Sequence, residues 1–296
     1  MNGSLLSRRD WLLHSCAVMS AASLGLRGVD RRTDAREELV RNPRGGYRFL
    51  PGLPFLSFGA IAAEGFEIVR TTLRQPRPLA DALRAIKRRL ENAGRPIHAL
   101  CGLELRSPGV PTGPEFVAMN QAYMAQLGQM GLLIDGSVPL TRTNVAASVQ
   151  ELSVHAYTHT LPVPRTEPVP SSFVISAVPE VRNLRRVSIG AEPPDFVAVG
   201  DTTAAGALTL DGLRKKTEFI LTSVSDTLGT LGVGWDDATG IQVYTLENAH
   251  PLLENLILPR LGAAAHLGLQ WHHNHPPGLI NLIEIDVRGI RVETMA

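Results

Sequence analysis

The chain has 296 residues, more than one hydrophobic core usually serves, and with 44% hydrophobic and 19% charged residues it has the composition of a globular protein. Its 29 Lys and Arg residues against 28 Asp and Glu residues leave it almost neutral, which excludes the basic excess of a nucleic-acid-binding protein, and we expect no nucleic-acid partner. Two cysteines, Cys16 and Cys101, are too few for a disulfide framework or a cysteine-rich zinc site.

The chain opens with a segment typical of an export leader. Residues 7–13 read Ser-Arg-Arg-Asp-Trp-Leu-Leu and precede a mostly apolar stretch that ends at Leu26, which resembles a twin-arginine leader. This stretch is about 15 residues long and contains His14, so it is too short and too polar for a stable membrane span. Residues 27–44 are charged throughout, as in a solvated spacer. We expect residues 1–44 to be the leader and spacer of an exported, periplasmic protein; the alternative is a cytoplasmic protein with an N-terminal extension.

A first domain is predicted over residues 45–161, with the element order ββαβαβ. Periodicity in hydrophobic residues distinguishes its helices from its strands, and Pro114 and Glu115 suit the first turn of a helix. The predicted elements are a strand hairpin at 54–60 and 65–70, a helix at 78–93, a strand at 97–106, a helix from residue 114, and a strand pair at 142–145 and 152–158.

A proline-rich segment separates this domain from the rest. Residues 162–170 contain prolines at positions 162, 164, 168 and 170, which forbid a helix or a central strand. We expect an extended linker there.

The second predicted domain, residues 171–296, repeats the first. Residues 82–105 can be laid over residues 220–243 without a gap, at an offset of 138 positions, so that apolar residues fall on apolar residues and Gly94 falls on Gly232. The predicted elements are strands at 172–178 and 196–200, a helix at 210–230, a strand at 239–245, a short helix at 252–257 and a strand at 282–287. The expected fold class is α/β (α+β), as two tandem ββαβαβ domains with the helices on one sheet face.

These elements resemble the Rid family, the reactive intermediate (imine/enamine) deaminases. The resemblance covers everything beyond the leader and rests on the segments 115–123, 142–145, 173–177, 242–245 and 282–286. The two-domain form is similar to deaminases of the 2-aminomuconate and 2-amino-5-chloromuconate type. The resemblance implies Rid-like (chorismate-mutase-like) domains, a trimer-based homo-oligomer, no cofactor, and hydrolytic release of ammonia from an imine, an enamine or another 2-amino-unsaturated carboxylate.

Four residues match functional positions of the Rid family. Arg142 matches the arginine that holds the substrate carboxylate, a task that suits its planar fork, and Asn120 matches an asparagine that bonds substrate or water. Ser176 matches a serine before a tight strand turn, and Glu284 matches the glutamate that positions the attacking water and accepts its proton. The alternative for each is an ordinary strand or helix residue that faces solvent or an ion-pair partner.

The second domain departs from the Rid pattern where its arginine would fall. Trp271, His272 and His273 stand near that position and are expected to line a pocket, in which one histidine could replace the arginine as carboxylate partner. No cysteine or further histidine has the spacing of a structural zinc site, and we expect no metal. In the first domain, residues 153–155 (Ser-Val-His) stand near the position where the Rid family has its glutamate.

The family residues are therefore divided between the halves. Arg142 and Asn120 lie in the first and Ser176 and Glu284 in the second, which leads to the hypothesis of one composite site across the interface between halves, within a chain or between chains. Two other functions stay open: a chorismatase-like hydrolase of a small polycarboxylate, and a Rid-fold ligand-binding protein without catalysis.

Overall fold

The computed structural model describes residues 38–111, 113–163, 171–177, 209–276 and 282–296. The predicted leader up to residue 37, residues 164–170 of the predicted linker and the predicted strand at 196–200 lie outside the described residues. No helix among the described residues has the length and apolar character needed to cross a membrane.

The first half carries most of the strands. Its elements are β1 (Val40–Asn42), β2 (Tyr47–Leu53), β3 (Leu56–Ala62), β4 (Phe66–Pro78), α2 (Leu79–Asn92), the 3-10 turn η1 (Ile97–Ala99), β5 (Leu100–Pro108), α3 (Gly113–Gln129), β6 (Thr141–Ala147) and β7 (Ser153–Pro162). The predicted helices and the predicted strand at 97–106 are confirmed. Strand β1 lies inside residues 27–44, the segment expected to be a charged spacer.

The second half follows the same succession. Its elements are β8 (Phe173–Ala177), α6 (Leu210–Leu231), η3 (Trp235–Asp237), β9 (Gly240–Thr245), η4 (His250–Leu252), η5 (Leu253–Ile257), α7 (Leu258–Leu261), η6 (Gly262–Leu267), β10 (Gln270–His272), β11 (Ile283–Gly289) and β12 (Val292–Met295). The long helix and the strands β8, β9 and β11 were predicted; the short strands β10 and β12 were not.

All twelve strands of the described residues belong to one sheet. Its order is β10-β9-β11-β8-β3-β6-β5-β7-β4-β12; off this path, β2 pairs with β3 and β1 pairs with β2. Within it, β10-β9-β11-β8 and β6-β5-β7-β4 have the same orientations: the first pair is parallel and the next two pairs are antiparallel. The repeated succession in the sequence therefore recurs in the strand pairing, although both halves share one sheet.

Two predicted pairings are wrong. Strand β3 forms its hairpin with β2 rather than with β4, and β6 and β7 both flank β5 instead of pairing with each other. Periodicity shows which residues form a strand, but it carries no information on which strand lies beside it.

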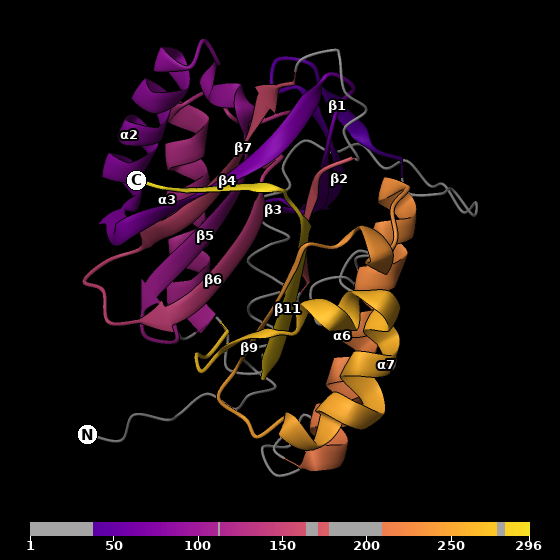
Figure 1. Cartoon of the computed structure of the whole chain (residues 1–296). Coiled ribbons are helices and arrows are strands. Elements are labelled where there is room, and N and C mark those ends of the chain that lie inside the picture. The colour runs from indigo at the N-terminus through magenta and orange to yellow at the C-terminus, as the bar shows by residue number, and fades with distance from the viewer. Residues whose placement is uncertain (1–37, 112, 164–170, 178–208, 277–281) are drawn as a thin grey trace, which may run out of the picture.

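The sheet is curled, and strand pairs join its two halves at two places. Strand β3 pairs with β6 at Ser57 and with β8 at residues 59–61, which joins the two halves on one side. Strand β12 follows directly after β11 in the chain, yet it pairs with β4 of the first half on the other side. Figure 1 shows the resulting arrangement, with α2 and α3 on one side of the strands and α6 and α7 on the other. The helices thus cover the outer face, and the inner faces of the two halves look toward each other.

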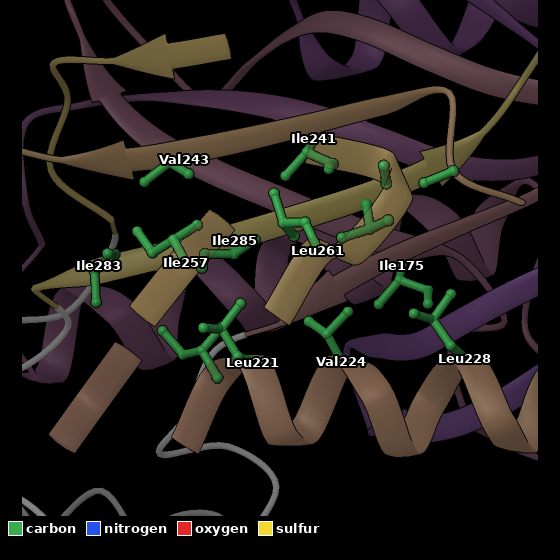
Figure 2. Packing of buried hydrophobic residues seen from close by; sticks show 14 of the residues in the cluster. Ile175, Leu221, Val224, Leu228, Ile241, Val243, Ile257, Leu261, Ile283 and Ile285 are labelled. Carbon is green, nitrogen blue, oxygen red and sulfur yellow. The ribbon is translucent and has the colours of Figure 1, made fainter. Parts of the chain in front are cut away.

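Each half has its own apolar core beneath its helices. In the second half, Leu221, Val224 and Leu228 of α6 pack on strand residues such as Ile241 and Ile285 (Figure 2). In the first half, the aligned residues Leu83, Ile86, Leu90, Leu103 and Leu105 are buried in the same way. The matching glycines both follow a helix and have left-handed backbone angles, with φ 68° at Gly94 and φ 79° at Gly232, which favour glycine at a helix end.

Candidate active site

Arg142 is held in a buried position on the outer face of β6. It is 4% exposed, its Nη1 donates to Asn120 Oδ1 over 2.6 Å, and its guanidinium lies over the rings of Phe55 (4.7 Å) and Tyr123 (5.1 Å). Burial lowers the pKa of the Arg142 guanidinium, whereas Tyr123 and the carboxylate of Glu284 raise it. The plane of the guanidinium is therefore fixed by its surroundings before any ligand binds.

Two polar atoms near Arg142 are buried without a hydrogen-bond partner among the described residues. They are the Tyr123 hydroxyl, on a residue that is 0% exposed, and Oδ1 of Asn144, on a residue that is 2% exposed. Asn144 follows Arg142 by two positions on β6, so both side chains leave the strand on the same face. Buried polar atoms without partners are rare in proteins, and they mark a place where a ligand can supply the missing bonds.

Glu284 lies on β11 in the second half and is 1% exposed. Its register partner on β9 is Tyr244, whose own partner on β10 is His272, so the three side chains form a row across three strands. The Tyr244 and His272 rings are stacked, with 4.5 Å between centroids. The Glu284 carboxylate acts electrostatically on both Arg142 and Tyr244, which brings the glutamate of the second half within range of the arginine of the first half.

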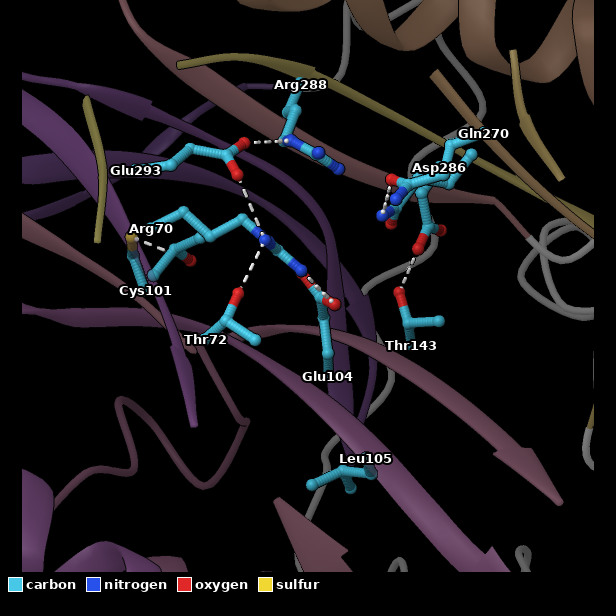
Figure 3. A network of polar contacts seen from close by, with 12 residues as sticks. Arg70, Thr72, Cys101, Glu104, Leu105, Thr143, Gln270, Asp286, Arg288 and Glu293 are labelled. Carbon is cyan, nitrogen blue, oxygen red and sulfur yellow. Dashed lines mark hydrogen bonds and ion pairs between the residues drawn. The ribbon is translucent and has the colours of Figure 1, made fainter. Parts of the chain in front are cut away.

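A second polar row runs beside the first. It consists of Gln242 on β9, which pairs with Gln270 on β10 and with Asp286 on β11. The backbone of Ser176 on β8 pairs with that of Asp286, and nothing is described of the Ser176 side chain. Gln242 donates to Gln270 and accepts from the Tyr244 hydroxyl, at 2.7 and 2.6 Å. The row meets the first half where the Thr143 hydroxyl donates to Asp286 (Figure 3).

An ion-pair chain also joins the halves (Figure 3). Arg70 of β4 donates from Nε and Nη2 to the two carboxylate oxygens of Glu104, at 2.6 and 2.8 Å, and from Nη1 to Glu293 of β12 at 3.1 Å. Glu293 also accepts from Arg288 Nε at 2.9 Å. Burial raises the pKa of Glu104, but the bonds and charge of Arg70 outweigh it and bring that pKa down to about 2. Glu104 therefore stays ionised between the two sheet faces.

A small cavity lies between these faces, with space of about 20 Å³ for a water-sized molecule. Its polar lining comes from both halves and includes Glu104, Thr143, Gln242, Asp286 and Arg288. This space holds about one water molecule.

The three residues expected at the second domain's arginine position lie apart. His272 faces the inner side on Tyr244, whereas Trp271 stacks on His250 at 4.9 Å between centroids. His273 is exposed. Within the part of the chain that the structure describes, no group of three or more His, Cys, Asp or Glu residues has the arrangement of a metal site.

The structure thus brings Arg142 and Asn120 into contact and places Glu284 within electrostatic range of Arg142. Sequence reasoning missed Asp286, Thr143 and Gln242. The alternation that singled out Glu284 extends to Asp286, whose apolar neighbours Ile285 and Val287 are buried under α6, and it could have identified that residue.

Comparisons with known proteins point to one activity. The family model described as 2-aminomuconate deaminase CnbZ matches residues 39–294. The 2-amino-5-chloromuconate deaminase of Comamonas testosteroni is 34% identical over 256 residues, which cover 85% of this chain and 96% of the relative.

Proposed function

The chain belongs to the 2-aminomuconate deaminase CnbZ family, and we propose on that premise that it hydrolyses 2-aminomuconate or a close 2-amino-unsaturated carboxylate and releases ammonia. The single observation that carries the proposal to particular residues is the meeting of β6 and β11, where Thr143 next to Arg142 donates to Asp286, two residues after Glu284. The charge of Glu284 raises the pKa of Arg142, which comes from the other half. One composite site would use a carboxylate anchor from the first half and a proton acceptor from the second.

Arg142 would bind the carboxylate next to the reacting carbon. The planar fork of its guanidinium suits charge-assisted bonds to both oxygens of a carboxylate, which would fix the imine carbon beside it. Asn144 Oδ1, buried without a partner among the described residues, would accept from the N–H of the substrate.

Glu284 would activate water. As the water oxygen adds to the C=N carbon, the electron pair of the double bond moves to nitrogen and a water proton passes to the carboxylate. Transfer of that proton to nitrogen gives a carbinolamine, in which carbon carries both OH and NH2. The hydroxyl proton then passes to nitrogen by way of the carboxylate, the C–N bond breaks as the C=O bond forms, and ammonia and a 2-oxo acid are released. Asp286, one pleat away on β11 and bonded to Thr143, would hold polar groups or water beside the reacting atoms.

Ammonia release from 2-aminomuconate generated in the assay mixture tests the proposal. The wild-type protein should release ammonia, and Glu284→Gln should lower kcat by about 100-fold or more, since a general base contributes that much. Glu254→Gln, at an exposed position, is the matched control and should leave turnover unchanged. Equal turnover by Glu284→Gln and the wild type would remove Glu284 from the mechanism.

The Rid-like nature of the two halves, the trimer-based homo-oligomer and the twin-arginine export address are parts of the same proposal. The recurring strand order of the halves supports the first of them. Light scattering of the purified protein tests the second. A fusion of residues 1–40 to a reporter that is active only outside the cytoplasm tests the third, and absence of reporter signal would contradict it.

A further inference from the structure

The small cavity between the sheet faces lies over a glycine that is flanked by two threonine hydroxyl groups. Gly102 of β5 has Thr141 of β6 and Thr158 of β7 as its register partners, and both threonines are 3% exposed. A Cβ atom at residue 102 would clash with the hydroxyl oxygens of both threonines and would lie 2.5 Å from that of Thr158. Glycine at this position therefore keeps a space open between the two hydroxyl groups.

The second half contributes the other side of the lining. Asp286 of β11 and Gln242 of β9 line the cavity together with Thr143 of β6, and the Thr143 hydroxyl donates to the Asp286 carboxylate. Each of these three side chains is buried. Because the cavity has space of about 20 Å³ for a water-sized molecule, its occupant has a single heavy atom.

The hydrogen bonds of the lining decide what such an occupant must offer. The Thr141 hydroxyl donates to the carbonyl oxygen of Cys101 at 3.3 Å, and the Thr143 hydroxyl donates to Asp286, so both hydroxyl oxygens can only accept from the occupant. The Thr158 hydroxyl instead accepts from the Cys101 thiol at 3.4 Å. Burial raises the pKa of this thiol to about 12, so the thiol keeps its proton and the Thr158 hydroxyl can donate its own to the occupant.

Ammonia matches this set of partners better than water does. It has three N–H donors and one lone pair, whereas water has two donors and two lone pairs. The three donors would serve Thr141, Thr143 and the Asp286 carboxylate, whose two oxygens offer several acceptor positions, and the lone pair would accept from Thr158. An ammonium ion has no lone pair to accept that proton, so the neutral form fits.

The cavity lies on the same side of β11 as Glu284. Asp286 follows Glu284 by two positions, so the two side chains share a face and their Cα atoms are about 7 Å apart along the strand. The residues between and beside them, Ile283, Ile285 and Val287, are buried under α6 on the opposite face. In the proposed reaction the nitrogen receives protons by way of Glu284, so ammonia forms within reach of the cavity.

We propose that this cavity binds the ammonia that leaves the substrate before it escapes to solvent. The inference rests on the proposed function and deepens it, because it gives the product nitrogen a site of its own. Ammonia held there is separated from the 2-oxo acid while both products are still bound.

Thermal unfolding in the presence of small amines tests the proposal on the substrate-free protein. In alkaline buffer, a high concentration of ammonium chloride should raise the wild-type melting temperature by about 2 °C above its value in equal sodium chloride, because a ligand of the folded state stabilises it. Methylammonium chloride should give no such shift, since its methyl group exceeds the space. The ammonium shift should grow with pH, as the neutral fraction rises. No shift, an equal shift with methylammonium, or a shift that does not grow with pH would overturn the proposal.

Two variants connect the shift to the cavity. Thr158→Val keeps the shape of the side chain but removes the hydroxyl, and Gly102→Ala fills the space; each should abolish the ammonium shift. Thr222→Val and Gly229→Ala, at exposed positions of α6, are the matched controls and should keep the full shift. Should the clash at residue 102 prevent folding, Thr158→Val decides, and a full ammonium shift in that variant would overturn the proposal.

The two proposals can fail independently. If ammonia stabilises the wild type but not Thr158→Val, while 2-aminomuconate yields no ammonia, the ammonia site stands and the deaminase function falls. If 2-aminomuconate yields ammonia but ammonium chloride gives no shift beyond that of sodium chloride, the ammonia site falls and the deaminase function stands.

Discussion

Replacing Glu104 by glutamine removes one negative charge from the ion-pair chain that joins the two halves. Glu104 receives two bonds from Arg70, and its side chain is 13% exposed, so solvent screens the pair weakly. Glutamine keeps the size of the side chain but cannot be ionised. The substitution therefore isolates the electrostatic part of the contact.

The magnitude follows from the pKa of Glu104, which falls from 4.5 in its ordinary environment to about 2 in the folded protein. By linkage, a decrease of this size corresponds to about 3 kcal/mol of folding free energy when the carboxyl is ionised. Because the folded-state pKa is depressed, this stabilisation is complete above about pH 4.5 and is lost as the pH falls toward 2.

Urea denaturation of the wild type and of Glu104→Gln measures the effect at both ends of this range. Near neutral pH the variant should lose about 3 kcal/mol, and the difference should shrink steadily below pH 4.5. Glu64→Gln, at an exposed turn, is the control and should follow the wild type at each pH. Equal stability of Glu104→Gln and the wild type near neutral pH would refute the reasoning, as would a difference that does not change with pH.

Three further predictions concern the glycine at the end of α6 and two buried side chains, Tyr123 and His155. Gly232→Ala should lower the free energy of unfolding by about 1 kcal/mol, because Gly232 ends α6 with φ 79°, and an unchanged thermal transition would contradict this. Tyr123→Phe should melt at or above the wild-type temperature, since its buried hydroxyl has no partner among the described residues; a melting temperature several degrees lower would show that the hydroxyl is bonded. Burial lowers the pKa of His155 from an ordinary 6.5 to about 4 in the folded protein, so the folded protein loses stability as the pH falls from 6.5 to 4. His155→Gln should therefore make the melting temperature depend less on pH in this range. A variant with the pH dependence of the wild type would count against the prediction.

The sequence predicted the elements of the fold better than their arrangement. The helix expected at 78–93 is α2 (Leu79–Asn92), because apolar residues recur at helical spacing and a glycine follows. The pairing of β12 with β4 could not be predicted, since it depends on how the whole sheet curls. Local periodicity specifies a strand's faces, whereas its neighbours are set by the global fold.

For the candidate site, too, the sequence identified residues but not their contacts. Alternation along β11 placed Glu284 on the face opposite its apolar neighbours, and family resemblance pointed to Arg142. The sequence could not show which cation pairs with Glu104, because Arg106 lies two positions away on the same strand and Arg70 lies on another. Only the structure shows that Arg70, from a different strand, occupies that carboxylate.

The central claim is that Arg142 and Glu284, from different halves, serve the same substrate molecule. The most direct test is the rate of ammonia release from 2-aminomuconate by Arg142→Ala, by Glu284→Gln and by the double variant. One composite site predicts that each single variant retains less than about 1% of the wild-type kcat/KM and that the double variant is little worse than either. Retention of roughly half of the activity by each single variant, with a much larger loss in the double variant, would show two independent sites and contradict the claim.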